Sequence, residues 1–138
     1  MHIVEDDASR AILSIIECSN ATTEMSINGM KEAMSYGTIR EAITDHGSQY
    51  TENKGNAGSS IFEQFLLEND MKHILCRVKH PQSNGKVEKL LHLYERHRDS
   101  FGSKEEFVHW YNNVRPHMSL DLSRLETPWR AFLRKRRD

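Results

Sequence analysis

Two carboxylates stand in settings that suit metal-dependent phosphate chemistry. Asp45 follows a strand-like run, and Glu88 closes the run HPQSNGKVE (residues 80–88), in which a turn-prone segment leads into a long helix. Carboxylate oxygens are good ligands for Mg²⁺ and Mn²⁺, and two such metals can stabilise the attacking and leaving oxygens of a phosphoryl transfer. Taken alone, each acid has an ordinary explanation, as a turn Asp before a glycine or as a Glu favoured at a helix start.

The elements that must position these acids alternate between strand and helix patterns. Three stretches rich in β-branched residues and a short N-terminal one predict strands, at residues 1–4, 10–18, 38–44 and 72–78. Apolar spacing and capping residues predict helices at about residues 21–35, 61–69, 86–100, 103–112 and from Thr127-Pro128 onward. Glycine and asparagine enrichment predicts a mobile loop at residues 46–59. The order ββαβαβααα indicates an α/β domain with a mixed sheet.

Composition limits the class of protein. The 138 residues are 37% hydrophobic and 28% charged, which predicts one folded domain over residues 1–138, with a helical C-terminal tail from about residue 103. No apolar run reaches the roughly 18 residues that a membrane span needs, and the N-terminus lacks a signal-peptide pattern, so we expect a cytoplasmic protein. The net charge is −1, but basic residues gather at Arg134–Arg137, where they either bind phosphates or form a solvated helix end.

Five segments, in order, resemble one family. They are EDDASR (5–10), TDHGSQYT (44–51), HPQSNGKVE (80–88), WYNNVRPHMSL (110–120) and ETP (126–128). Together they resemble the DDE superfamily of transposases and retroviral-type integrases, in its insertion-sequence branch, over nearly the whole chain. The resemblance implies a ribonuclease-H-like fold with a mixed sheet flanked by helices, Mg²⁺ or Mn²⁺ as cofactor, and cleavage and transfer of DNA strands at the nucleoid of a prokaryotic cell. It assigns Asp45 and Glu88 as the second and third metal-binding, catalytic acids.

The chain departs from the family pattern in two ways. First, 43 positions separate Asp45 from Glu88, several more than is typical, and the excess fits residues 51–60. Second, the family's first acid lies on a first strand upstream of the EDDASR turn, and the sequence opens at the second strand. Asp6 or Asp7 could substitute as a metal ligand, but turn chemistry is the favoured explanation of both.

The missing strand has consequences for activity and for the sheet. We expect the chain alone to be inactive or nearly so, because two carboxylates do not assemble a two-metal clamp. We also expect a distorted sheet, or one completed by a homo-oligomer or a strand-donating partner, because the family's first strand is central and its loss leaves two unpaired edges.

Other polar residues suggest contacts with DNA. Lys86, Lys89, His92 and Arg96 on the long helix are candidates for binding DNA phosphates at mobile-element ends, although solvated lysines are commoner. In the RPH motif, Arg115 and His117 fit a structural role better than a catalytic one.

Two further functions compete with the transposase core. One is a non-catalytic DNA-binding or oligomerising protein on the same fold that modulates a full-length transposase. The other is a ribonuclease-H-like nuclease with a different substrate, which the transposase-type motifs make less favourable.

Overall fold

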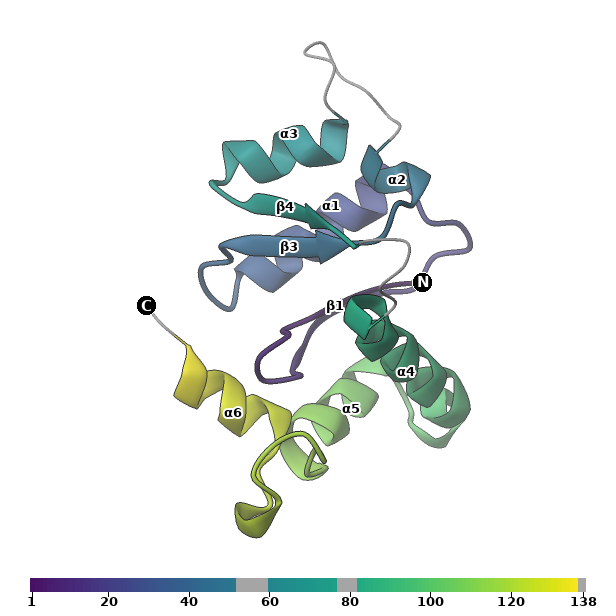
Figure 1. Ribbon diagram of the computed structural model, residues 1–138. Coiled ribbons are helices and arrows are strands. Elements are labelled where there is room, and N and C mark those ends of the chain that lie inside the picture. Colours follow the sequence, from purple (N-terminus) through teal and green to yellow (C-terminus); the bar gives the residue numbers. More distant parts are fainter. Residues whose placement is uncertain (52–59, 77–81, 137–138) are drawn as a thin grey trace.

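The computed structural model describes residues 1–51, 60–76 and 82–136, and it is an α/β arrangement (Figure 1). Its strands are β1 (His2–Glu5), β2 (Ile12–Ile16), β3 (Glu41–Thr44) and β4 (Lys72–Leu75). Its α-helices are α1 (Thr23–Met34), α2 (Ser48–Thr51), α3 (Ile61–Glu68), α4 (Gln82–His97), α5 (Lys104–His109) and α6 (Pro128–Lys135). Shorter turns of 3-10 helix occupy Arg98–Ser100 and Leu122–Arg124, and a π-helix spans Trp110–Val114. No helix within these described ranges has the length and apolar character needed to cross a bilayer.

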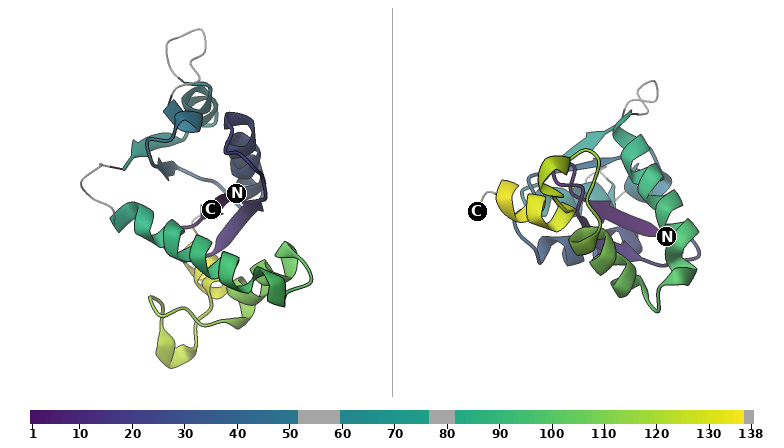
Figure 2. Two further views of the ribbon diagram at one scale, coloured as in Figure 1. Left: turned by 90° about the vertical axis from the view of Figure 1, so that its right-hand side faces the viewer. Right: turned by 90° about the horizontal axis from the view of Figure 1, so that it is seen from below.

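The four strands form two separate pairs. β1 and β2 are antiparallel, with His2 opposite Ile16 and an irregularity between Val4 and Glu5. β3 and β4 are parallel, with Glu41 opposite Lys72. The prediction of one mixed sheet is therefore wrong, because no hydrogen bond within the described part of the chain joins β1 to β3. The left view of Figure 2 shows the two pairs apart from each other.

A cavity lies between the two pairs. It has a volume of about 280 Å³, and every residue of β1 and every residue of β3 lines it. We call it the interstrand cavity. The interrupted sheet agrees with the expectation of a distorted sheet, since the edges of β1 and β3 face a space instead of each other.

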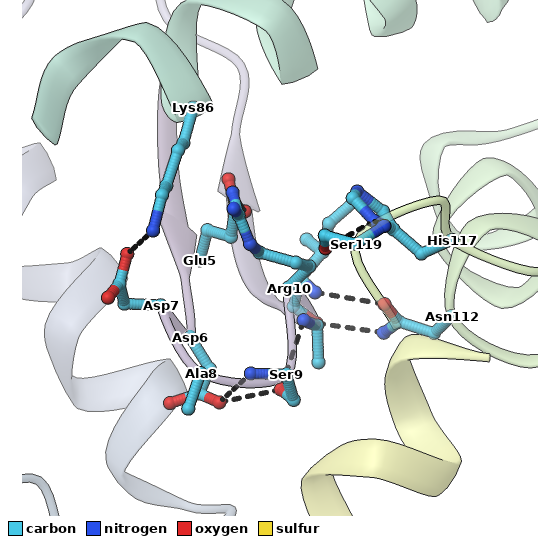
Figure 3. A network of polar contacts seen from close by, with 12 residues as sticks. Glu5, Asp6, Asp7, Ala8, Ser9, Arg10, Lys86, Asn112, His117 and Ser119 are labelled. Atoms are coloured by element: carbon cyan, nitrogen blue, oxygen red, sulfur yellow. Dashed lines mark hydrogen bonds and ion pairs between the residues drawn. The ribbon is translucent and has the colours of Figure 1, made fainter. Parts of the chain in front are cut away.

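The β1–β2 hairpin is held by a side chain at its turn. Asp6 Oδ2 accepts hydrogen bonds from the backbone N–H of Ser9 at 2.9 Å and from its hydroxyl at 2.6 Å (Figure 3). The backbone N–H of Asp6 donates to the carbonyl of Ala11 at 2.9 Å. Arg10 takes a left-handed conformation, with φ of 67°, to close the turn. Asp6 thus performs the turn chemistry that its position in the sequence favours.

Helix α1 packs closely on the hairpin. Thr22 caps it by accepting a hydrogen bond from the N–H of Met25, and its inner face buries Met30 and Ala33. A Cβ atom on Gly29 would lie 2.7 Å from Nδ1 of His2, so only glycine permits this approach. Met30 joins Phe62 and Leu66 of α3 in a buried cluster that also covers Ala42 of β3. Helix α1 therefore connects the two strand pairs.

The other side of the hairpin packs on α4, α5 and the π-helix. The core there consists of Ile3, Ile12, Ile15, Leu90, Tyr94, Phe107 and Tyr111. Ser103 caps α5 through the N–H of Glu106, as the sequence predicts.

Helix α4 begins at Gln82 and not at Lys86, so residues 82–85 are helical instead of forming the predicted turn. The first helical turn tolerates such residues because its N–H groups need no partner within the helix.

Asn112 of the π-helix binds the outer edge of β2 at Ile12. Its Nδ2 donates to the carbonyl of Ile12 and its Oδ1 accepts from the N–H of Ile12, each at 2.9 Å (Figure 3). Both residues are buried, so the side-chain amide takes the place of a neighbouring strand.

Helix α6 follows the predicted Thr127 cap and places Phe132 in a third cluster with Ala11 and Ala33. Leu133 on the same helix is 51% exposed because the helix turns it toward solvent. Trp129 stacks on Phe132, with ring centroids 5.1 Å apart.

Replacing Asn112 with alanine should lower the free energy of unfolding by about 3 kcal/mol, because two buried backbone groups of Ile12 lose their partners. Urea unfolding followed by circular dichroism measures this loss. Asn113→Ala is the matched control, since Asn113 is exposed and adjacent. Equal unfolding midpoints for the two variants would show that the edge of β2 needs no such contact.

Candidate functional site

Asp45 lies immediately after β3 in a fixed turn. Its Oδ1 accepts a hydrogen bond from the N–H of Gly47 at 2.8 Å, and the carboxylate is otherwise exposed. A Cβ atom on Gly47 would lie 2.9 Å from Asp45 Oδ1 and 2.7 Å from Gln49 Oε1, so the absence of a side chain here leaves room for both of these side chains. The neighbouring His46 contacts the carbonyl of Cys76 through Nε2 at 2.8 Å. The turn therefore holds one carboxylate oxygen in place beyond the carboxyl end of β3.

Glu88 lies in the second turn of α4, and its side chain is exposed. The carboxyl end of β3 and the amino-terminal end of α4 lie on the same side of the molecule (Figure 1). The two acids that the sequence singles out thus lie close to the end of β3 and close to the start of α4, on one side of the molecule. His80 and Pro81 of the same motif lie outside the described residues.

The described residues do not complete a metal centre. Nowhere in residues 1–51, 60–76 and 82–136 do three or more His, Cys, Asp or Glu side chains gather closely enough to hold a metal ion. Asp45 and Glu88 offer the oxygen donors that Mg²⁺ or Mn²⁺ prefers, but a stable site takes further ligands. The donor chemistry fits such a metal, whereas the number of donors does not.

Asp6 and Asp7 are engaged elsewhere. Asp6 anchors the hairpin turn, and Asp7 Oδ1 pairs with Nζ of Lys86 at 2.7 Å (Figure 3). The pair is half exposed, which makes it a weak contributor to stability. Its main effect is to direct Lys86, one of the candidate DNA contacts, toward the hairpin.

The other three candidate DNA contacts share one exposed face of α4. Lys89, His92 and Arg96 are exposed, and their spacing of three and four residues places them in a row along the helix. Glu88 and Glu95 are exposed on the same helix. The face thus mixes positive and negative charge.

The RPH segment is structural in the geometry seen here. The guanidinium of Arg115 lies over the rings of Trp110 and Tyr111, 5.9 and 5.8 Å from their centroids. Nδ1 of His117 accepts from the N–H of Ser119 at 3.1 Å. Burial lowers the pKa of His117, which keeps the ring neutral as an acceptor. These contacts fix the path of the chain between the π-helix and α6.

Glu5 is a residue that the sequence analysis did not single out. Its side chain is 4% exposed, and its Oε1 lies 3.7 Å from a guanidinium nitrogen of Arg10 (Figure 3). Burial raises the pKa of Glu5 to about 7, more than Arg10 lowers it. The only feature of the sequence that could have indicated this burial is the position of Glu5 at the end of the strand segment HIVE.

Comparisons with known proteins place the chain among relatives. No protein-family model matches it. An uncharacterized protein of Archaeoglobus fulgidus is 30% identical over 96 residues, which cover 70% of this chain and 75% of that protein. The chain belongs to the same family as this archaeal protein. "Putative integrase ORF3" of Spiroplasma virus SpV1-C74 is 29% identical over 145 residues, covering 90% of this chain and 39% of the viral protein. The chain is therefore integrase-like.

A solved structure shares the fold. A chain of the simian T-cell lymphotropic virus intasome, solved in complex with PP2A regulatory subunit B56 gamma, superposes with a TM-score of 0.70 at 18% identity. The match covers 94% of the present chain and 46% of that chain. At this identity the match concerns the fold alone, and the present chain spans less than half of both the viral integrase-like protein and the intasome chain.

The buried Glu5 predicts a pH dependence of stability. Because the pKa of Glu5 is about 7 when folded and near 4.5 when unfolded, its protonated form stabilises the fold below pH 4.5, and this contribution is lost as the pH rises through 7. Glu5→Gln should remove the effect. Urea unfolding across this range should show the wild type losing stability relative to the variant.

The comparison isolates Glu5 from the other buried titrating group on β1. Burial lowers the pKa of His2 to about 4, so its contribution changes in the opposite direction and is the same in both proteins. Glu41→Gln, at an exposed acid, is the control. A stability difference between wild type and Glu5→Gln that stays constant with pH would contradict the prediction.

Proposed function

We propose that the chain is part of the catalytic core of a DDE-type transposase or integrase with a ribonuclease-H-like fold. The observation that carries the proposal is the turn that holds Asp45 after the end of β3, on the side of the molecule where α4, the helix that carries Glu88, begins. Both residues stand in the motifs that resemble the second and third acids of that superfamily. The integrase-like relatives support the same assignment.

In this proposal Asp45 and Glu88 bind Mg²⁺ or Mn²⁺ through carboxylate oxygens. The metal would supply Lewis-acid stabilisation of charge on the reacting phosphate of DNA. The chain's own part is to hold Asp45 in the turn closed by Gly47 and to carry Glu88 on a rigid helix. The exposed row of Lys89, His92 and Arg96 would contact the phosphates of mobile-element DNA.

We further propose that residues 1–138 by themselves are inactive or nearly so. The two carboxylates lack a third acid among the described residues, and Asp6 and Asp7 are held in a turn and an ion pair. In the superfamily the remaining acid, the first in sequence order, comes from a strand preceding β1.

A non-catalytic role is the second candidate. The open edges of β1 and β3 favour it, since they could take up a strand from a full-length transposase or from another copy of the chain. Such a protein would bind DNA or oligomerise and would modulate the transposase without cleaving DNA.

DNA cleavage tests the proposed site. With Mg²⁺ or Mn²⁺, the 138-residue chain should leave a supercoiled plasmid intact. A chain extended before Met1 by a β-strand that ends in Asp should nick it. Asp45→Asn and Glu88→Gln in the extended chain should reduce nicking to background, because each removes a metal ligand. Glu95→Gln, an exposed acid on the same helix, is the control.

Two results would contradict different parts of this proposal. An extended chain that folds but never nicks DNA would argue against Asp45 and Glu88 as metal ligands. Nicking by the 138-residue chain that Asp45→Ala abolishes would show that two acids suffice, and the inactivity prediction would be wrong.

DNA binding is a separate prediction. Lys89→Ala and Arg96→Ala should each weaken binding and reduce the slope of log K against log salt by about 1, since each removes one phosphate contact. Fluorescence anisotropy with labelled duplex DNA at several salt concentrations measures this slope. Lys31→Ala, at an exposed lysine of α1, should leave it unchanged. Salt-independent binding, or equal effects at all three positions, would remove the DNA-contacting role of α4.

A further inference from the structure

Thr44, the last residue of β3, has a side chain that bridges two parts of the fold. Its Oγ1 donates a hydrogen bond to the backbone carbonyl of Asp45 at 3.0 Å, and the same oxygen lies 2.7 Å from Nε2 of His73 on β4. A hydroxyl group carries one hydrogen and two lone pairs. Because that hydrogen goes to Asp45, the ring of His73 supplies the hydrogen of the second contact.

The register of the strands explains why these two side chains meet. In the parallel pair of β3 and β4, Thr44 lies opposite Leu75 and Ala42 lies opposite His73. Side chains two residues apart on a strand share a face, so Thr44 and His73 are diagonal neighbours on one face of the pair. The ring of Phe62 on α3 lies edge-on to the ring of His73, with centroids 5.6 Å apart. His73 is therefore held in place by packing, and its side chain is only 10% exposed.

The surroundings of His73 agree with a neutral ring that carries its hydrogen on Nε2. Burial lowers the pKa of His73, more than the nearby carboxylate of Glu63 raises it. The other ring nitrogen, Nδ1, lies 3.7 Å from Oε1 of Glu63, which is too long for a hydrogen bond. A neutral imidazole has one N–H, and of the two contacts the one with Thr44 has hydrogen-bond length. The hydrogen bonds therefore run in one direction, from His73 to Thr44 and from Thr44 to Asp45.

A second histidine ties the same turn to β4. Nε2 of His46 lies 2.8 Å from the carbonyl oxygen of Cys76, and the ring is the donor because a carbonyl oxygen only accepts. The N–H of Cys76 in turn donates to the carbonyl of Thr44 at 2.9 Å. The residues on both sides of Asp45 are thus bound to β4, while Oδ1 of Asp45 accepts the N–H of Gly47.

We propose that His73 is a positioning residue for Asp45 and acts through the hydroxyl of Thr44. The hydrogen bond from Thr44 limits rotation of the Asp45 peptide group, and the one from Gly47 limits rotation of its side chain. A functional site works best when its groups are held by side chains that are themselves locked by packing and hydrogen bonds. The use of this positioning rests on the proposed function, because it needs a metal-binding Asp45, whereas the direction of the hydrogen bonds does not.

Nitrogen NMR of the 138-residue chain tests the hydrogen-bond direction without metal or DNA. With isotope-labelled histidine near neutral pH, the ring of His73, identified by the loss of its signals in His73→Gln, should carry hydrogen on Nε2 and none on Nδ1. Thr44→Val keeps the shape of the side chain but has no hydroxyl. It should therefore shift the Nε2 signal and the backbone amide signal of Gly47, the donor to Asp45. Thr38→Val, at an exposed threonine, should shift neither signal.

Strand nicking by the extended chain tests the consequence for the proposed reaction. Thr44→Val and His73→Leu should each reduce the nicking rate at saturating DNA about tenfold, because a displaced carboxylate is poorly aligned with the reacting phosphate. The Kd for DNA should change less than about twofold, since neither side chain is a proposed phosphate contact. Thr44→Ser keeps a hydroxyl and His73→Gln keeps an N–H donor, so both should retain at least about half of the wild-type rate.

The possible results separate this proposal from the proposed function. A ring of His73 with its hydrogen on Nδ1 would show that it donates toward Glu63 and would overturn the proposal. So would a Gly47 signal or a nicking rate that stays unchanged in folded Thr44→Val, or equal losses of nicking in Thr44→Ser and Thr44→Val. An extended wild-type chain that folds but never nicks DNA would contradict the proposed function, and the NMR measurements would then still decide whether His73 positions Asp45.

Discussion

The structure depends on where the backbone groups of four short strands find partners. β2 pairs with β1 on one side, and on the other side the side-chain amide of Asn112 binds its first residue, Ile12. Among the described residues, β1 and β3 each pair on one side only, and α1 holds the two strand pairs together without closing the space between them. Helices thus connect the two strand pairs through apolar side chains, and no backbone hydrogen bond between the described strands does so.

Local signals predicted those parts of the fold that depend on neighbouring residues. Ser103 with Glu106, Thr127 before Pro128 and Asp6 in the hairpin turn each behave as their positions indicate, because capping and turn hydrogen bonds span only a few residues. The division into two sheets could not be read locally, since strand pairing is decided by residues far apart in sequence. The start of α4 at Gln82 was missed because serine, asparagine and glycine disfavour a helix interior but are tolerated in its first turn.

For the candidate site, the sequence identified the acidic residues but not their surroundings. The sequence singled out Asp45 and Glu88 through their motifs, and the structure adds the turn in which the N–H of Gly47 holds Asp45. The sequence could not show that Glu5 is buried, because an acid between a strand and a turn usually reaches water. Nor could the sequence show that Lys86 pairs with Asp7, a contact between residues 79 positions apart. Ion pairs between residues far apart in sequence, and the burial of charged groups, can be assessed only once the fold is known.

The π-helix at Trp110–Val114 takes up one extra residue in the chain between α5 and α6. The N–H of Arg115 bonds to the carbonyl of Trp110, five residues back, so the turn holds one residue more than an α-helical turn would. Five residues of a π turn and four of an α turn cover nearly the same rotation about the helix axis, so losing one residue here would leave the direction of the chain beyond almost unchanged. In homologous proteins, this segment should therefore tolerate a one-residue deletion that spares Asn112 and Tyr111, which contact Ile12 and the core.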